Sequence, residues 1–323
     1  MATNADVVKT SKLIIPETYL PTIYDKVAAN AVIPTLIPQR PKLYNLDEMI
    51  YVTEKPKAQY VQPVEGGEKN ATTFGFDSKP MQKFKIQTTI RLTEDTIFAD
   101  EDSSLELLDL VFDEMGESLG QAVDSGMIHA IDPFTGGSIT GAEEVALAKI
   151  ATEVTEGATL QATVDALPDK VLEAGFNVNG IALDNLFANA LRKDRNPNTG
   201  ARNYPDVPLT LDMGTFEGLR AVTSPNVSGR SLGITDTGIR AIIGDWNMAQ
   251  WGVIREMALR RFDVGDPDNR GYDLAYKNEV AYRVEMIFAF GVVYDDAFAV
   301  LKGEPYKTAS LNAAPRKVAT KDE

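Results

Sequence analysis

Apolar side chains recur at helical spacing in one long stretch of the chain. They follow one another three or four residues apart, at Leu105, Leu108, Phe112, Met115, Leu119 and Ala122. This spacing gathers them on one face of an α-helix. Ser103 and Glu106 have the spacing of a capping box, and acidic residues immediately before them favour a helix N-terminus. The pattern predicts a long amphipathic helix over residues 103–130.

A different periodicity, of two residues, occurs near the C-terminal end. Apolar side chains alternate with other residues at Val280, Tyr282, Val284, Met286, Phe288 and Phe290, which predicts a long β-strand. Between these two elements, helical and extended patterns alternate. Helices are expected at 162–176 and 186–193, and strands at 180–185, 218–223 and 240–246. The chain is therefore expected to adopt an α+β fold.

The N-terminal part carries little periodic pattern. Five prolines fall within the first 41 residues, which predicts an extended arm with little core of its own. From Met49 to Arg91 the chain is rich in Val, Thr, Tyr, Phe and Gln and contains Gly66 and Gly67, so we expect a long two-stranded excursion that closes near Gly66. A two-stranded ribbon is marginally stable alone in water, so this one should lie against its own body or a neighbouring subunit.

Composition narrows the class of protein. The chain has 323 residues, of which 44% are hydrophobic, enough for one large or two ordinary domains. Cysteine is absent, which excludes disulfides and thiolate metal sites. No apolar run approaches membrane-spanning length and no secretory signal pattern is present, so no membrane partner is expected. The formal net charge of −15 has the wrong sign for gripping nucleic acid by its phosphates.

The usual signatures of catalysis are also missing. No two glycines are separated by one residue, which excludes a dinucleotide-binding fingerprint. His129 is the only histidine, and its place near a helix end favours a structural role. Asp263, Asp266 and Asp268 do not have the spacing of a calcium loop and predict a polar turn. We therefore expect no enzyme, cofactor or metal, although a carboxylate-dependent or metal-dependent hydrolase stays an alternative.

The order of these features resembles the major capsid proteins of tailed double-stranded DNA bacteriophages, whose fold is shared with encapsulins. Four stretches carry the resemblance: LIIPETYLPTIYDKVAANAVIPTLI, VEGGEKNATTFGF, IALDNLFANALRKDRNPNTGARNY, and IIGDWNMAQWGVIREMALRRFD continuing to NEVAYRVEMIFAFGVVYDDAFAVLKG. Each is loose alone, whereas together and in this order they cover most of the chain. The last is the most specific.

The resemblance implies a division of the chain into named parts. These are an N-terminal arm (1–48), an extended E-loop hairpin (49–91), a peripheral domain (92–160 and 276–303) with the long spine helix (103–130), an axial domain (161–275) and a C-terminal tail (304–323). The implied function is a major capsid protein that self-assembles as hexamers and pentamers into an icosahedral shell. An encapsulin-type nanocompartment shell is the closest alternative.

The resemblance also implies partners and a location. The shell would enclose packaged double-stranded DNA without binding it specifically, and a portal protein would complete it. Some family members carry a long N-terminal scaffolding segment that a protease removes. Here the arm begins almost at Met1, so we expect either a separate scaffold protein or an already processed chain. The protein would be assembled in the host bacterial cytoplasm and reside in the virion capsid.

Charge suggests how neighbouring subunits would meet. Residues 54–91 contain seven basic and four acidic side chains, whereas residues 93–148 contain no Lys or Arg. One face of the predicted long helix is acidic and carries Glu106, Asp109, Asp113, Glu117 and Asp124. We expect the ribbon of one subunit to lie over this acidic helix of its neighbour, with charge setting the register. The residues predicted for this interface are Lys55, Lys57, Lys79, Lys83, Lys85, Glu106, Asp109, Asp113 and Glu117. The alternative is that both are merely solvated faces.

A self-crosslink is the last expectation from the resemblance. In some family members an E-loop lysine attacks a peripheral-domain asparagine, assisted by a glutamate. The matching positions are Lys69, Asn278 and Glu285. Seven residues separate Asn278 from Glu285, which places them on opposite faces of an ideal strand, so a bulge, a twist or an early strand start would be required.

Overall fold

The computed structural model describes residues 31–37, 48–60, 70–103, 107–232 and 236–305. Contacts within this part of the chain define two compact units. The first unit contains Lys85–Gln121 and Glu256–Met286, and the second contains Val32–Phe84, Ala122–Arg255 and the chain from Ile287 onward. Three boundaries between the units fall inside long strands and one falls inside a long helix, so each unit is built from separate stretches of sequence. The predicted boundaries at 160 and 276 do not coincide with this division.

A mixed six-stranded sheet forms the core of the second unit. Its strand order is β4 (Thr152–Thr155), β11 (Phe298–Lys302), β8 (Ile239–Gly244), β5 (Gly180–Leu183), β7 (Leu219–Thr223) and β6 (Thr215–Phe216). β8 runs antiparallel to both β11 and β5, while β5 and β7 are parallel. Every residue of β5 and β8 is buried. Their side chains are small or apolar except for that of Arg240 on β8, which pairs with Asp236 at 3.4 Å.

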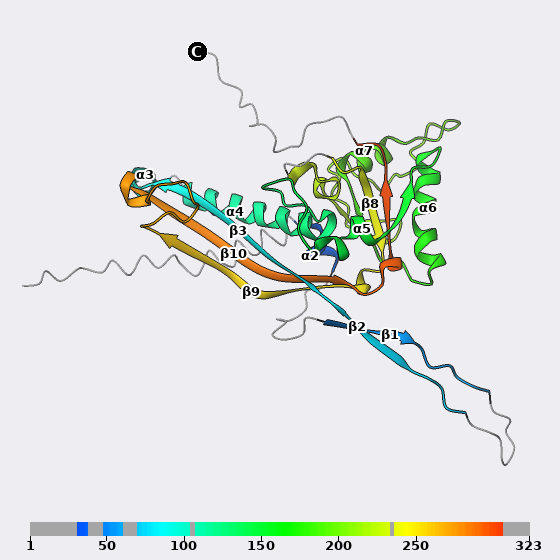
Figure 1. Ribbon diagram of the computed structural model, residues 1–323. Helices are drawn as coiled ribbons and strands as arrows, with labels where there is room; N and C mark the ends of the chain where they lie inside the picture. The colour runs from blue at the N-terminus through cyan, green and yellow to red at the C-terminus, as the bar shows by residue number, and fades with distance from the viewer. Residues whose placement is uncertain (1–30, 38–47, 61–69, 104–106, 233–235, 306–323) are drawn as a thin grey trace, which may run out of the picture. The chain divides into compact units, whose positions relative to one another are not determined.

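Two helices contribute to the core beside this sheet. Helix α6 (Leu160–Glu173) packs against β4, β8 and β11, and α7 (Asn185–Lys193) follows β5 directly. Each begins with a side-chain cap: Thr159 accepts a hydrogen bond from the Ala162 amide, and Asp184 accepts from the amides of Leu186 and Phe187. Both helices appear where the sequence predicted them, and Figure 1 shows α6 along one side of the sheet.

The six-stranded sheet joins strands from two of the predicted domains. The sequence assigned β4 and β11 to a peripheral domain and β5, β7 and β8 to an axial domain. In the structure β11 pairs with both β4 and β8, so these strands share one sheet and one core. The order of strands along the chain does not reveal such pairing, because β11 is more than 50 residues from β8 and more than 140 residues from β4.

Three long strands form a separate sheet in the order β3 (Gln82–Thr93), β10 (Glu279–Val292) and β9 (Ala249–Phe262). The alternation that predicted a strand from Val280 to Phe290 is therefore confirmed by β10. Inside the first unit, the ring of Tyr282 on β10 meets Phe112 edge to face, with 5.5 Å between centroids.

The long helix of the sequence is present with different bounds. Helical structure begins earlier than predicted, in α3 (Glu94–Ser103), and the predicted capping box includes Glu106, which lies outside the described residues. Helix α4 (Leu107–Asp124) then carries the predicted apolar stripe, with Met115 and Leu119 buried. A π-helical turn, η1 (Ser125–His129), continues α4, and Ala130 ends it in the left-handed conformation.

The short helix α2 (Val32–Leu36) lies within the predicted N-terminal arm and is largely buried. Ala31, Val32, Ile33, Leu36 and Ile37 are all buried, and α2 packs against β7. The indole Nε1 of Trp251 donates a hydrogen bond to the Ile37 carbonyl oxygen at 3.1 Å. This stretch belongs to the core of the second unit. The short helical pattern predicted around Leu20 to Val27 lies outside the described residues.

Short elements complete the described chain. They are α5 (Leu147–Ile150) and the 3-10 turns η2 (Ala142–Glu144), η3 (Pro225–Ser228), η4 (Arg230–Leu232), η5 (Trp246–Met248), η6 (Leu274–Lys277) and η7 (Asp295–Ala297).

Candidate interaction surface

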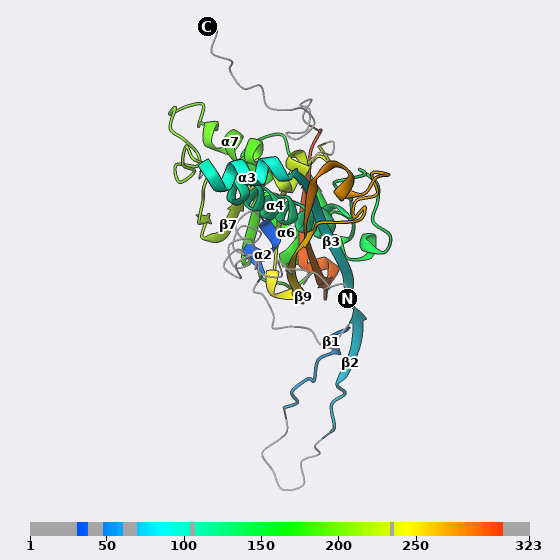
Figure 2. The ribbon, with the colours of Figure 1, turned by 90° about the vertical axis from the view of Figure 1, so that its left-hand side faces the viewer.

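Within the predicted excursion of residues 49–91, β1 (Glu48–Glu54) and β2 (Gly75–Pro80) form an antiparallel pair, here called the ribbon. The rest of the predicted second strand belongs to β3, which pairs with β10 instead. Figures 1 and 2 both show the two strands side by side. The expected turn at Gly66 and Gly67 lies outside the described residues. Ile50 lies opposite Ser78, and Val52 opposite Phe76. Because cross-strand partners share a face and successive residues alternate, Ile50, Val52 and Phe76 lie on one face of the ribbon.

The opposite face of the ribbon is anchored within the second unit. Met49 is buried in a small apolar cluster with Met81 and Ala289. The Tyr51 ring meets Tyr294 edge to face at 5.7 Å, and the Tyr294 hydroxyl donates a hydrogen bond to the Val52 carbonyl oxygen at 2.8 Å. This face therefore covers its apolar side chains without a second molecule.

The remaining face exposes large apolar side chains to water. Ile50 is 68% exposed, Phe76 is 69% exposed, and Phe74 just before β2 is 58% exposed. The rings of Phe74 and Phe76 lie 6.3 Å apart. A concentration of exposed aromatic surface on one face is typical of an interaction site. The charge-based prediction missed these residues, although their spacing of two residues in the sequence was a usable signal.

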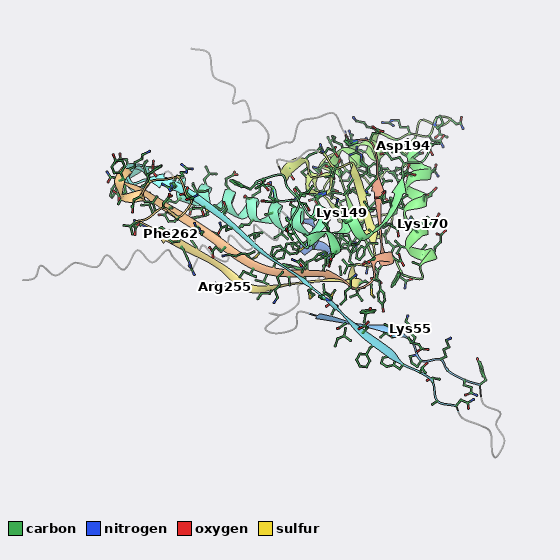
Figure 3. All side chains as sticks on the ribbon, in the orientation of Figure 1. Lys55, Lys149, Lys170, Asp194, Arg255 and Phe262 are labelled. Atoms are coloured by element: carbon green, nitrogen blue, oxygen red, sulfur yellow. The ribbon has the colours of Figure 1, made fainter. Side chains whose placement is uncertain are left out.

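The predicted basic residues of the interface are not all available to a neighbour. Lys55 and Lys57 are exposed on the chain that follows β1, where Figure 3 labels Lys55. Lys79 instead pairs with Asp295 of its own chain at 2.8 Å, and the Lys85 Nζ lies 3.6 Å from Glu285. Lys83 is exposed and also has an interaction within the chain. Acidic side chains of the same chain therefore already pair with some of the lysines predicted to contact a neighbour.

The predicted acidic residues lie along α4, with one exception that the sequence misplaced. Asp109 and Glu117 are exposed and Asp113 is half-buried. Glu106 lies outside the described residues. Asp124, which helical spacing placed on the same acidic face, is completely buried and accepts hydrogen bonds from backbone amides. The acidic face is therefore shorter than predicted.

The residues expected to form a crosslink are only partly described. Lys69 lies outside the described residues. Asn278 has a positive φ of 53° and precedes β10 directly, so the regular strand begins after it. Glu285 lies on β10 beside two cations of its own chain, 3.6 Å from Lys85 and 3.9 Å from Arg283. The crosslink stays a prediction.

The aspartate-rich turn between β9 and β10 holds an arginine. The Arg91 guanidinium donates to Asp266 at 2.5 Å and to Glu279 at 3.2 Å, and it also contacts Asp268. These contacts agree with the predicted polar turn. In the described part of the chain, no group of three or more acidic or histidine side chains could hold a metal ion. His129 is buried, and its Nε2 donates to the Asn226 carbonyl oxygen at 2.9 Å.

No helix of the described residues is long and apolar enough to cross a membrane.

Comparisons with known proteins identify the family. The model of the phage capsid family matches residues 12–303. A solved chain from Mycobacterium phage Ogopogo is 30% identical, with a TM-score of 0.73 over 84% of this chain and 91% of that one. A chain from Gordonia phage Cozz is 28% identical, with a TM-score of 0.73 over 84% of this chain and 86% of that one. No curated protein sequence matches this chain.

A more distant structure shows the same fold. The capsid of an empty GTA particle is 10% identical, with a TM-score of 0.55 over 84% of this chain and 89% of that one. The chain belongs to the phage capsid family, because the family model matches most of its length. Its function is that of a major capsid protein, a structural protein that assembles into the shell of the virion.

Proposed function

We propose that copies of this chain assemble as hexamers and pentamers into a closed icosahedral shell around double-stranded DNA, and that the exposed face of the β1–β2 ribbon forms the contact between neighbours. The observation that carries this proposal is the difference between the two faces of the ribbon. One face is covered by Tyr294 and its surroundings, whereas Ile50 and Phe76 remain in water. In a shell of identical chains, a second copy is the molecule available to cover them.

The surface that would receive the ribbon is α4 of the neighbour. Leu110 is 56% exposed on α4 and lies between the acidic residues Asp109 and Asp113 in the sequence. Leu110 would contact the exposed aromatic side chains of the ribbon. Its acidic neighbours would contact Lys55 and Lys57, which follow β1. Apolar burial would supply most of the affinity and charge would set the register.

Replacement of Phe76 by Ser tests the ribbon contact. We expect this variant to fold and to lose shells, because its ring is exposed in the subunit and would be buried in the assembly. Negative-stain electron microscopy and sedimentation of the expressed chain measure this. Leu172→Ser, at a side chain that is 53% exposed on α6, is the matched control. Normal shells from Phe76→Ser would contradict the proposed contact.

A charge swap tests the register more specifically. Lys55→Glu combined with Lys57→Glu should weaken assembly, and adding Asp109→Lys and Glu117→Lys should restore it. These exposed lysines are better targets than Lys85, whose reversal would also disturb its pair with Glu285. Assembly that ignores both the reversal and the swap would show that the faces are merely solvated.

The remaining partners follow from the charge of the chain and from its family. A net charge of −15 favours enclosing DNA without specific binding, because an acidic wall repels phosphates. A portal protein and a separate scaffold would take part in assembly in the host cytoplasm, and the chain itself would catalyse no reaction on another molecule. Purified particles that contain DNA and a portal protein support this, whereas particles filled with a protein cargo oppose it.

Covalent joining through Lys69, Asn278 and Glu285 remains a separate proposal. The amine of Lys69 would attack the side-chain amide of Asn278, ammonia would leave, and Glu285 would accept a proton. The positive φ of Asn278 supplies the break in strand geometry that this arrangement needs. Boiling mature particles in detergent gives a ladder of oligomers if the bond forms, and Glu285→Ala should abolish the ladder. A single band at the 35.2 kDa chain mass rejects the reaction.

A further inference from the structure

A buried carboxyl group at the end of α4 holds the N-terminal segment of the second unit. The Asp124 side chain is fully buried. Its Oδ1 accepts hydrogen bonds from the Val32 amide at 2.9 Å and the Ile33 amide at 3.1 Å, and its Oδ2 lies 2.8 Å from the same Val32 nitrogen. The two amides belong to the first turn of α2, so Asp124 attaches α2 to α4.

A second contact of the same carboxyl group reaches the turn after β7. In the structure the Asn226 Nδ2 donates a hydrogen bond to the Oδ2 of Asp124 at 2.6 Å, and the Ser231 hydroxyl donates to the Asn226 Oδ1. A separation of 2.6 Å is short for an N–H donor and ordinary for an O–H donor. The two orientations of an asparagine amide fit almost the same atomic positions, so the hydrogen-bond pattern must decide between them.

Among the described residues, no cation forms an ion pair with the Asp124 carboxyl group. Helix α2 and turn η3 contain no ionisable side chain. Burial raises the pKa of Asp124 to about 7, although hydrogen bonds from Asn226, Val32 and Ile33 act in the opposite direction. The other charged or titratable groups of this region are His129 of η1, Arg230 with its partner Asp184, Asp236, and Lys149. Burial lowers the pKa of His129 to about 4, so this side chain is neutral near pH 7.

We propose that Asp124, Asn226 and Ser231 form a proton-dependent latch, in which neutral Asp124 fastens α2 and loss of its proton loosens it. In the protonated form the Oδ2–H of Asp124 donates to the Asn226 side-chain oxygen, whose amide nitrogen donates to the Ser231 hydroxyl. When the proton passes to water, the Asn226 amide must turn over so that its nitrogen faces the carboxylate. The backbone contacts to Val32 and Ile33 persist in both forms, but the ionised form is buried without a cation.

The sign of the pH effect follows from the raised pKa. An open state exposes Asp124, which then ionises at its ordinary value near 3.8, whereas the closed state keeps its proton up to about pH 7. Opening therefore releases a proton between these values, and the latch is strongest at low pH. Linkage predicts that the opening equilibrium rises about tenfold per pH unit between roughly pH 5 and 6.5 and levels off above pH 7.

Hydrogen exchange of the full-length chain, followed at the Val32 and Ile33 amides and corrected for the intrinsic pH dependence, tests the latch. Asp124→Asn keeps a neutral side chain with one donor and one acceptor, so its exchange should be low and independent of pH. Glu114→Gln, at an exposed position of α4, is the matched control and should retain the wild-type profile.

Two outcomes would overturn the proposal. One is wild-type exchange that falls or stays constant as the pH rises from 5 to 7, since a carboxylate latch would tighten on ionisation. The other is an Asp124→Asn chain that folds and assembles but exchanges faster than wild type at pH 5. If Asp124→Asn fails to fold, the pH dependence of exchange in the wild-type chain still tests the proposal. Exchange that rises from pH 5 to 7 supports the latch, and exchange that falls or stays constant overturns it. The test does not depend on the proposed ribbon contact, because it measures protection inside one subunit.

Discussion

The six-stranded sheet and the β1–β2 ribbon, both in the second unit, use β-structure in opposite ways. In the sheet, strands β5 and β8 have no exposed residue and two capped helices complete the core. The ribbon has two strands, and one of its faces leaves Ile50 and Phe76 in water. The sheet is complete within one chain, whereas one face of the ribbon leaves apolar side chains uncovered.

A phenylalanine therefore has a different role in each of these two regions. Phe187 of α7 is buried against the sheet, and Phe76 of β2 is exposed. Truncation of the first should change the stability of the subunit, and truncation of the second should change its association. A capsid protein needs both, because a shell assembles from subunits that fold first.

Phe187→Ala should have the largest effect on the folded subunit. Removing a buried ring leaves a cavity in the core, and such changes cost about 3–5 kcal/mol. Denaturant unfolding of the unassembled chain, followed by tryptophan fluorescence, measures the loss. Phe187→Leu, which keeps most of the volume, is the control and should lose clearly less stability. Equal losses for the two variants would mean that the cavity does not determine the cost.

Loss of a helix cap in the same core should have an intermediate effect. The Thr159 hydroxyl oxygen accepts a hydrogen bond from the Ala162 amide at 3.1 Å, and it caps α6. Thr159→Ala should cost roughly 1 kcal/mol of stability, whereas Thr159→Ser should retain most of it. The same unfolding measurement compares them. An alanine variant as stable as wild type would show that the Thr159 hydroxyl adds nothing to the start of α6.

Local patterns predicted the elements better than they predicted the contacts between them. The period of two in β10 and the caps and apolar stripes of α6 and α7 are properties of neighbouring residues, so the sequence was sufficient. The pairing of β11 with β4 and β8 depends on residues far apart in the chain, so local patterns could not predict it.

For the interaction surface too, the sequence indicated the residues better than the contacts that they make. Its lysines and acidic residues were visible as charge, but which of them pair internally, as Lys79 does with Asp295, depends on the fold. The charge pattern placed Asp124 on the exposed acidic face, whereas this residue is buried. The helical spacing of α4 could not indicate that α2 covers it. The exposed apolar face with Ile50 and Phe76 could have been predicted from apolar residues two positions apart in the sequence. The prediction based on charge did not use this pattern.

Phe76→Ser should leave the stability of the unassembled subunit nearly unchanged, which makes it the counterpart of Phe187→Ala. A change at an exposed position is expected to stay within about 0.5 kcal/mol. The unfolding midpoint of the purified subunit should therefore match that of wild type while shell formation is lost. A large drop in the midpoint would instead mean that the exposed face of the ribbon is covered by its own subunit.

The smallest predicted effect is local and concerns acid rather than a mutation. In the first unit, the hydrogen bond from Arg91 holds the pKa of Asp268 below its usual range, and burial opposes this shift. A carboxylate with a depressed pKa stabilises the fold above its unfolded pKa near 3.8, and this contribution is lost as the pH falls through the depressed value.

The turn between β9 and β10 should therefore become less protected from hydrogen exchange below about pH 4, the ordinary range of an aspartate. Arg91→Gln should remove this acid dependence, and Arg270→Gln, at an exposed arginine that also pairs with Asp268, is the matched control. The response is opposite in sign to that of Asp124, whose contribution weakens as the pH rises from 4 to 7. One exchange experiment across this range distinguishes them: the turn of the first unit should open at the acidic end, and α2 of the second unit at the neutral end. Protection that changes in the same direction in both segments would reject the assignment of Arg91 and Asp268 to the turn's acid response.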